Sequence, residues 1–253
     1  MSSAALILAA GESRRMGSPK ALLDFAGASF LDTLIGLLAP RCSPVIVVLG
    51  ASADDIRAAA GRPAAFVVNA EWQRGQLTSM QCGLRAVPPE ASGVLFTLVD
   101  HPAVASVSID ALLTAQWDRP SPSVASWDGP SARESSWKTV PKGGTDDRFL
   151  SSVVVGRDGP PVLSRPCHSS LENDSLGAAE LLRVPRYRGR RGHPIWFSRE
   201  LFLEFLDLPA GGAARDVVRR HAEDTAFLDL DDPGIVADID DRADYAALLR
   251  EAS

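Results

Sequence analysis

The sequence has few cysteines and lacks any long apolar run. Cys42, Cys82 and Cys167 lie far apart with no C-x-x-C pair, which argues against a disulfide framework and against a zinc knuckle. The apolar run at residues 4–10 is too short to cross a bilayer, and it lacks the basic start and longer apolar core of a signal peptide. We therefore expect a cytoplasmic protein with no membrane association.

An excess of positive charge is also missing. The chain carries 26 Lys and Arg against 32 Asp and Glu, a net charge of −6, and its isoelectric point is near 5.3. Surfaces that bind DNA or RNA usually carry the opposite balance, so we expect no nucleic-acid partner. A local basic patch remains compatible with a small phosphorylated ligand. The 45% hydrophobic and 23% charged content of the 253 residues is that of a globular protein with a sizeable core.

Apolar strand patterns alternate with helical patterns along much of the chain. Continuous apolar runs, typical of buried parallel strands, occur at residues 4–8, 45–49, 65–68 and 93–99. Helices are predicted at 30–38, 54–60, 77–86 and 104–113. This alternation predicts an α/β fold of the Rossmann-like, doubly wound type, with a mostly parallel sheet between two layers of helices (three-layer α/β/α).

The predicted strands end in residues suited to a ligand site. Gly11, Gly50, Asn69 and Asp100 each follow one of these strands. Ligands in such sheets bind beyond the carboxyl ends of the strands, so we expect these four residues to lie along one edge.

The regular pattern is lost from residue 117 to about residue 183. Ser, Pro, Gly and isolated Trp dominate there, with one weak strand predicted at 153–155. Further on, helices are predicted at 200–206, 216–221 and 243–249, and a strand at 225–230. We interpret residues 1–253 as a single domain with an irregular insertion at about 117–183.

A loop rich in glycine and basic residues follows the first predicted strand. It reads LAAGESRRMGSPK from Leu8 to Lys20 and contains two glycines, two arginines and a lysine. Small residues let backbone N–H groups approach an anion, while guanidinium and ammonium groups neutralise a polyphosphate. The spacing fits neither a Walker A loop nor the dinucleotide motif G-x-G-x-x-G. We interpret the segment as a triphosphate-binding loop; a basic turn exposed to water is the alternative.

The stretch LAAGESRRMGSPKALL at residues 8–23 resembles the signature loop of the MobA-like and MocA-like nucleotidyltransferases, which are molybdenum cofactor guanylyl- and cytidylyltransferases. Further matches follow in the family's order at residues 75–80, 99–102, 191–194, 211–215 and 238–240. The resemblance covers residues 4–116 and 184–249. It implies a fold like that of the nucleotide-diphospho-sugar transferases.

The resemblance also implies roles for individual residues. The nucleotide-binding residues would be Leu8, Ala9, Ala10, Gly11, Arg15, Lys20, Gly50 and Ser79. Among these, Arg15 and Lys20 would hold phosphates.

Asp100 is the candidate ligand for a divalent cation. It ends a buried predicted strand, and Mg²⁺ (or Mn²⁺) prefers carboxylate oxygens and shares its remaining positions with phosphates and water. By the resemblance, Asp240, or less well Asp238, would supply a second carboxylate. The alternative for Asp100 is a helix N-cap before residues 104–113.

These residues support a transfer reaction without a protein nucleophile. We expect an acceptor phosphate to attack the α-phosphorus of the nucleotide, with Arg15, Lys20 and Asp100 as the catalytic residues. The acceptor side is implied by the resemblance at Arg191 and His193, and at His101, which stands where the family usually has glutamine. A solvated basic loop with a structural histidine is the alternative for residues 186–193.

The predicted function is that of a Mg²⁺-dependent, cytidylyltransferase-like enzyme. It would transfer the nucleotidyl group of CTP to molybdopterin cofactor and release pyrophosphate. CTP is favoured because Leu-Ala-Ala-Gly at residues 8–11 resembles MocA more than MobA, which usually has Leu-Ala-Gly-Gly.

Departures from the family pattern bear on the acceptor more than on the reaction. Residues 75–80 lack the usual serines, His101 replaces glutamine, residues 240–243 lack Thr-Pro, and the insertion is long. One alternative is an enzyme of the same fold that acts on a sugar phosphate, phosphocholine or a phospholactate. Another is a non-catalytic insertion chaperone, with a molybdenum hydroxylase as its partner.

Overall fold

The computed structural model describes residues 2–114, 180–209 and 211–251. These residues belong to one compact unit of the chain. The strand expected at 153–155 and nearly all of the expected insertion lie outside the described residues.

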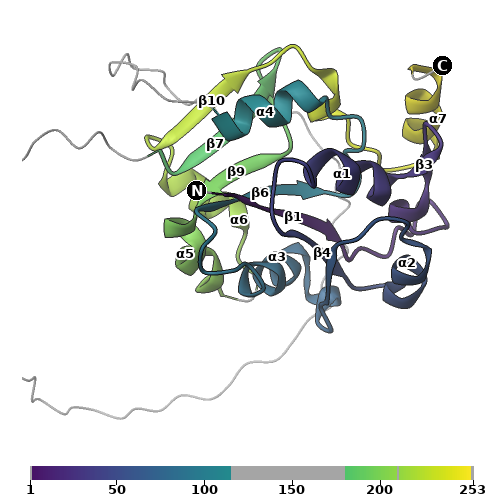
Figure 1. Cartoon of the computed structure of the whole chain (residues 1–253), viewed down its shortest axis with the longest axis horizontal. Coiled ribbons are helices and arrows are strands. Elements are labelled where there is room, and N and C mark those ends of the chain that lie inside the picture. Colours follow the sequence, from purple (N-terminus) through teal and green to yellow (C-terminus); the bar gives the residue numbers. More distant parts are fainter. Residues whose placement is uncertain (1, 115–179, 210, 252–253) are drawn as a thin grey trace, which may run out of the picture. The chain divides into compact units, whose positions relative to one another are not determined.

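A mixed sheet of eight strands forms the centre of this unit (Figure 1). The strands are β1 (Ala4–Ala9), β4 (Val45–Leu49), β5 (Ala65–Val68), β6 (Gly93–Leu98), β7 (Leu182–Tyr187), β8 (Arg190–Arg191), β9 (Ile195–Ser198) and β10 (Thr225–Asp229). Their order is β10-β7-β9-β6-β1-β4-β5, with β8 paired to β7. Strands β6, β1, β4 and β5 are mutually parallel, and β9 runs antiparallel to both β6 and β7. The mostly parallel sheet predicted from the sequence is confirmed.

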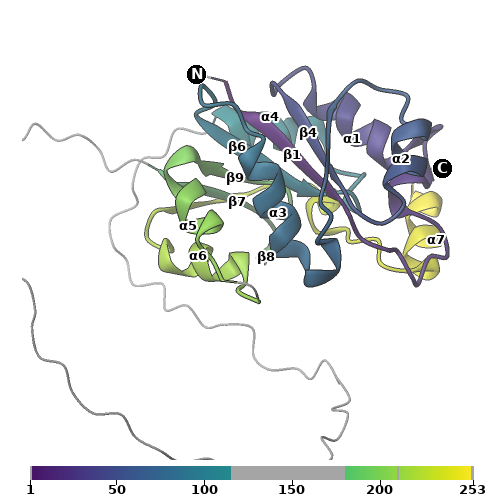
Figure 2. The same cartoon turned by 90° about the horizontal axis from the view of Figure 1, so that it is seen from below.

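Helices cover both faces of the sheet (Figures 1 and 2). One face carries α1 (Phe30–Leu38), α2 (Ala53–Ala59), α4 (Ser106–Thr114) and α7 (Arg242–Glu251). The other face carries α3 (Gln76–Arg85), α5 (Phe202–Leu206) and α6 (Ala214–Arg220). Short 3₁₀ turns occur at Lys20–Leu22, Trp72–Arg74, Arg199–Leu201 and Pro233–Val236, and a small hairpin joins β2 (Asp24–Phe25) to β3 (Ala28–Ser29). Within the described ranges, no helix is long and apolar enough to span a bilayer.

The apolar runs of the central strands are explained by burial on both faces. In β1, Ala5 and Ile7 pack in the core under α1, whereas Leu6 and Leu8 pack in the core under α3. Successive side chains of a strand point to opposite faces, so a strand covered on both sides needs an unbroken apolar run. The same argument applies to β4, whose five residues are all buried.

The second half of the sheet begins earlier in the chain than the sequence pattern indicates. Strand β7 starts at Leu182, inside the segment expected to be an insertion, and pairs with β8 across Arg188 and Gly189. Both turn residues have positive φ, 49° and 78°, as a two-residue hairpin turn requires. The basic segment is therefore a β-hairpin rather than a loop.

Arg183 joins the two ends of the described chain that flank residues 115–179. Its guanidinium Nη1 donates to the carbonyls of Leu112 and Leu113 at 2.8 and 3.2 Å. The same guanidinium lies 4.4 Å above the ring of Trp196 in β9. The end of α4 and the start of β7 are thus held side by side.

Candidate active site

The loop after β1 is shaped by Ser13. Its carbonyl accepts hydrogen bonds from the N–H groups of Met16 and Gly17, and its hydroxyl accepts one from the N–H of Lys20 at 3.0 Å. Ser13 and Gly17 have φ of 53° and 75°, the left-handed region that lets the chain turn sharply. The turn brings Lys20 back toward the carboxyl edge of the sheet.

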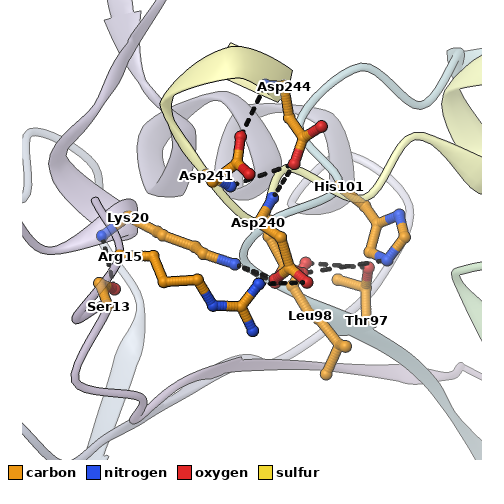
Figure 3. Close-up of polar contacts among 10 residues, drawn as sticks. Ser13, Arg15, Lys20, Thr97, Leu98, His101, Asp240, Asp241 and Asp244 are labelled. Carbon is orange, nitrogen blue, oxygen red and sulfur yellow. Dashed lines mark hydrogen bonds and ion pairs between the residues drawn. The ribbon is translucent and has the colours of Figure 1, made fainter. Parts of the chain in front are cut away.

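The ammonium group of Lys20 lies between two carboxylates (Figure 3). Nζ is 3.0 Å from Asp100 Oδ2 and 2.8 Å from Asp240 Oδ1. The side chains of Lys20 and Asp100 are 13% and 16% exposed, so water screens this contact only in part. The side chain of Arg15 is more exposed and points at the carboxylate of Asp240, with Nη1 3.5 Å from Oδ2. Residues distant in the sequence thus form one charged cluster.

Asp240 is positioned by the start of α7. Its N–H and that of Asp241 donate to the carboxylate of Asp244 at 3.0 and 3.1 Å, while the carboxylate of Asp241 accepts from the N–H groups of Ala243 and Asp244. This reciprocal arrangement is a capping box, which fulfils the function of the missing Thr-Pro. The N–H of Ile239 also donates to the carbonyl of Asp100. The capped helix end therefore keeps the two site carboxylates close together.

Charge and burial shift the pKa values of this cluster. Burial lowers the pKa of Lys20, but hydrogen bonds and charges from Asp240 and Asp100 outweigh it, so the pKa is raised and the group stays an ammonium. The hydrogen bond from Lys20 lowers the pKa of Asp240. Burial, followed by the charges of Asp100 and Asp240, raises the pKa of Asp238 to about 6. The cluster holds more negative charge than the lysine neutralises.

A pocket of about 490 Å³ opens over this cluster. Its lining is mostly the loop after β1 and the ends of β1 and β6: Leu8, Ala9, Ala10, Gly11, Glu12, Ser13, Arg14, Arg15, Pro19, Lys20, Ile56, Trp72, Gln76, Ser79, Leu98, Val99, Asp100 and Asp240. We call this the nucleotide pocket. Its lining contains every residue predicted for the nucleotide except Gly50, and it contains Asp100 and Asp240 but not Asp238, the alternative metal ligand.

Gly50 lies beside the nucleotide pocket rather than in its wall. A Cβ at this position would meet the carbonyl of Ala10 at 2.6 Å and Trp72 Cβ at 2.7 Å. Glycine is therefore needed for a close backbone approach that supports the loop. Asn69 is likewise a supporting residue, since its amide donates to the hydroxyls of Thr78 and Ser79 at the start of α3.

A second pocket of about 630 Å³ lies over β7 and β9, between α3 and α6. Its inner wall is apolar, and three arginines and His193 supply charge or polarity: Arg74, Gly75, Gln76, Leu77, Thr78, Met80, Phe96, Leu182, Val184, Arg191, His193, Ile195, Phe197, Phe205, Gly211, Gly212, Ala213, Ala214, Arg215 and Val218. We call this the acceptor pocket. Gln76, the first residue of α3, lines both pockets.

The two histidines expected on the acceptor side are placed differently. His193 lines the acceptor pocket, and burial followed by the nearby His101 lowers its pKa to about 4. His101 is 5% exposed and lines neither pocket; its ring centre lies 5.1 Å from that of His193. Burial also lowers the pKa of His101. Both imidazoles are neutral near pH 7.

Asp100 does not cap helix α4, because Asp232 accepts the hydrogen bonds at the start of that helix. The N–H of Ala105 and the hydroxyl of Ser108, at the start of α4, donate to the carboxylate of Asp232 at 2.9 and 2.6 Å. Asp232 is 6% exposed and was not predicted from the sequence. Sequence reasoning also missed Arg74 and Trp72, because a single residue between predicted elements carries no pattern. It missed Ile56 because a buried apolar residue of a predicted helix is expected in the core rather than in a pocket wall.

A loop with two glycines and two arginines, facing carboxylates at the carboxyl edge of a Rossmann-like sheet, is the arrangement expected of an α/β nucleotidyltransferase. A family model described as the MobA-like NTP transferase domain matches residues 5–225, and the chain belongs to this family.

Two curated relatives share sequence with about half of the chain. A probable molybdenum cofactor guanylyltransferase of Mycobacterium avium (strain 104) is 34% identical over 121 residues, 45% of this chain and 57% of the relative. A 2-C-methyl-D-erythritol 4-phosphate cytidylyltransferase of Deinococcus radiodurans is 39% identical over 113 residues, 44% of this chain and 45% of the relative. The chain therefore spans only about half the length of these relatives.

A solved structure matches the fold over nearly the whole chain. Rv0371c from Mycobacterium tuberculosis H37Rv superimposes with a TM-score of 0.64 at 22% identity, covering 99% of both chains. The manganese complex of that protein gives a TM-score of 0.61. At this identity the likeness concerns the fold.

Proposed function

We propose that the protein transfers a nucleotidyl group from a nucleoside triphosphate to a phosphorylated acceptor with release of pyrophosphate. The observation that carries the proposal is the cluster of Arg15, Lys20, Asp100 and Asp240 in the floor of the nucleotide pocket. An acceptor phosphate oxygen forms a bond to the α-phosphorus, and the bond to the β-phosphate oxygen breaks. Pyrophosphate carries away the electron pair. We expect the reaction to take place in the cytoplasm.

The two pockets adjoin at the start of α3, a position that suits the reacting phosphates. Gln76 lines both, and it begins α3 after Gly75, whose φ is 114°. The first N–H groups of a helix lack acceptors within the helix and favour anions. The start of α3 therefore supports a position for phosphate between the nucleotide pocket and the acceptor pocket.

The carboxylate pair fits a divalent cation such as Mg²⁺ or Mn²⁺. In the structure, the ammonium of Lys20 sits 3.0 and 2.8 Å from the two carboxylates as a stand-in cation. Asp100 and Asp240 would hold the metal, which neutralises phosphate charge when bound. Lys20 and Arg15 would then be free to bind the pyrophosphate oxygens. The manganese complex of Rv0371c supports a divalent cation in this fold.

The chemistry of the acceptor pocket favours an acceptor with a flat ring system that ends in a phosphate. Met80, Phe96, Phe197 and Phe205 form an apolar wall against which a flat ring can pack, and polar side chains of the same pocket can bind the edge of such a ring. The guanidinium of Arg191 lies at the same pocket and binds phosphate well. We propose molybdopterin cofactor as the acceptor, as the named guanylyltransferase relatives also suggest.

Ala10 is the residue we propose to set the base. It is 6% exposed and lines the nucleotide pocket. Its methyl group takes space that a glycine leaves open, which favours cytosine over the larger guanine. GTP is the second candidate, because the Mycobacterium avium relative is named as a guanylyltransferase. We predict that Ala10→Gly shifts the ratio of kcat/KM for CTP over GTP roughly tenfold toward GTP.

The proposal is tested by pyrophosphate release. The purified protein is incubated with Mg²⁺, molybdopterin cofactor and CTP, GTP or ATP in turn, and the run is repeated with Asp100→Ala. Release with CTP that is lost in the variant supports the proposal, and release with GTP alone corrects the base. Release with a sugar phosphate, phosphocholine or a phospholactate instead corrects the acceptor. No release with any combination contradicts transfer and favours an insertion chaperone for a molybdenum hydroxylase.

A further inference from the structure

One short segment of the chain contributes to both pockets. Trp72 lines the nucleotide pocket, Arg74 lines the acceptor pocket, and Gln76 lines both. The segment consists of the 3₁₀ turn Trp72–Arg74, then Gly75 and the first residue of α3. Arg74 therefore enters the acceptor pocket from the segment that it shares with the nucleotide pocket.

The backbone that carries Arg74 is held in place by hydrogen bonds. Its N–H donates to the carbonyl of Glu71 at 2.9 Å. The hydroxyl of Thr78 lies 3.1 and 2.9 Å from the carbonyls of Glu71 and Gly75, and it accepts a hydrogen bond from the side-chain amide of Asn69 at 2.9 Å. Asn69 is itself buried. The turn is thus anchored to the core, although the Arg74 side chain is exposed.

The guanidinium group of Arg74 is held only by a surface ion pair. Nη1 lies 2.7 Å from Glu71 Oε1, and the two side chains are 53% and 61% exposed. Exposed pairs of this kind contribute little to stability, because water screens them and both side chains lose freedom. Glu71 lines neither pocket. A phosphate carries more charge than this carboxylate and can accept two parallel hydrogen bonds from a guanidinium, so it competes well for Arg74.

The lining of the acceptor pocket favours an anion. Arg74, Arg191 and Arg215 line the pocket, and none of its described lining residues carries a carboxylate. This local excess of positive charge is opposite in sign to the net charge of −6 on the chain. The guanidinium of Arg191 lies 4.5 Å from the ring centre of Phe227 in β10, a contact that holds it beside the hairpin. Arg74 is the arginine whose chain neighbours also line the nucleotide pocket.

We propose that Arg74 exchanges its ion pair with Glu71 for the phosphate of the acceptor, and holds that phosphate at the border of the two pockets. The inference rests on the proposed nucleotidyl transfer and names a residue that orients its nucleophile. A guanidinium that binds two phosphate oxygens leaves the third directed at the α-phosphorus of the nucleotide. Arg191 then contributes affinity for the acceptor, and Arg74 contributes orientation as well.

The first test measures binding without nucleotide, by isothermal titration calorimetry of the full chain with 1-naphthyl phosphate. This probe is a flat ring that carries one phosphate. Arg74→Ala should weaken its binding roughly tenfold, the effect of losing one charged hydrogen-bond donor. 1-Naphthol, which lacks the phosphate, should bind the wild type and the variant equally. Arg85→Ala, an exposed arginine at the end of α3 that lines neither pocket, is the matched control and should bind the phosphate probe like the wild type.

Glu71→Gln should have an effect of opposite sign. It removes the competing charge and keeps the backbone carbonyl that accepts from Arg74, so 1-naphthyl phosphate should bind about threefold more tightly. If the ion pair only stabilises the turn, the same substitution leaves binding unchanged or weakens it.

Steady-state pyrophosphate release then separates orientation from affinity. Arg74→Ala should lower kcat roughly a hundredfold, because a misplaced nucleophile loses the advantage of alignment. Arg74→Lys keeps the charge and loses the planar fork, so it should recover the KM of the acceptor without recovering kcat. Equal recovery of both constants would show that Arg74 contributes charge alone.

Three results of the binding experiment would overturn the proposal: unchanged affinity for 1-naphthyl phosphate in Arg74→Ala, no gain in Glu71→Gln, or no binding to the wild type at millimolar concentration. None of them depends on nucleotidyl transfer, because the titration contains no nucleotide. A protein that binds the phosphate probe through Arg74 and releases no pyrophosphate supports the phosphate site and contradicts the proposed reaction.

Discussion

The nucleotide pocket and the acceptor pocket differ in how they are built. The nucleotide pocket is formed largely by one loop, residues 8–20, and its floor holds four charged side chains. The acceptor pocket is assembled from α3, β6, β7, β9 and α6, and its wall is apolar with arginines around it. Charged side chains are thus concentrated where the phosphates of the nucleotide would lie. Where the acceptor would lie, the fit between apolar surfaces contributes more to binding.

The difference in lining determines which substrates each pocket can distinguish. Ionic contacts to a triphosphate are common to all four nucleoside triphosphates, so the charged floor supports the reaction more than the choice of substrate. An apolar wall rejects strongly hydrated molecules and accepts flat ones. Substitutions in the two pockets should therefore affect different kinetic constants.

The largest effect is expected at Asp100. Asp100→Ala removes a carboxylate that faces both Lys20 and the proposed cation, and kcat should fall roughly a thousandfold, because metal charge stabilisation is worth several kcal/mol. Steady-state pyrophosphate release measures the effect. Asp110→Ala, an exposed carboxylate on α4 paired with Arg41, is the control and should retain wild-type kcat. Equal losses in both variants would point to misfolding instead.

Lys20→Met should lower kcat roughly a hundredfold, the usual cost of removing one charged donor at a developing negative charge. It also removes the ammonium between Asp100 and Asp240 and leaves only the more exposed Arg15 at Asp240. The melting temperature should fall, and Mn²⁺ should raise it more in this variant than in the wild type. Thermal unfolding with and without MnCl₂ measures this. An identical Mn²⁺ effect in both proteins would show that the lysine does not compete with a cation.

Arg191→Ala should raise the KM of the acceptor roughly tenfold and leave the KM of the nucleotide unchanged, because Arg191 lines only the acceptor pocket. Arg190→Ala on the same strand is the matched control, since Arg190 lines neither pocket. If both variants change the KM of the acceptor equally, the hairpin contributes only general positive charge.

The smallest effect is expected on stability at Asp238. Its pKa is raised to about 6 in the fold from the ordinary value of 3.8, so the native state binds more protons between these values and loses stability as pH rises through them. Asp238→Asn should raise the melting temperature at pH 7.5 in the absence of divalent ions and give no gain at pH 4. A gain of equal size at both pH values would contradict the linkage.

The fold was predictable where one segment carries its own pattern. Helix α1 and strand β4 have the predicted bounds because burial on one stripe of a helix, or on both faces of a strand, leaves a clear apolar pattern. Strand β5 also has the predicted bounds, but it was wrongly expected to be buried: it is an edge strand and none of its residues is buried. Strand β7 was not predictable, because Pro185 and two arginines interrupt its apolar residues. Arg183 donates to two backbone carbonyls, and Arg186 donates to the carboxylate of Asp229. Both contacts appear only in the folded chain.

The candidate site followed the same rule. The loop at residues 8–20 is contiguous and carries a motif, so its residues and Asp100 were named from the sequence, and the structure brings them together. Asp232 and Arg74 were missed because their roles come from tertiary contacts. The assignment of His101 to the acceptor stays a prediction; the structure places the imidazole behind Asp100, where neither pocket reaches it.

The contact of Arg183 with Leu112 and Leu113 marks a position in the fold where the connecting segment can be replaced. Since the end of α4 and the start of β7 are held together by hydrogen bonds of 2.8 and 3.2 Å, we expect the sheet to tolerate changes in the length of the chain that connects them. The entropic cost of closing a loop grows only slowly with its length. Evolution, or an engineer, can therefore exchange the connecting segment as a module while the catalytic edge on the far strands keeps its geometry.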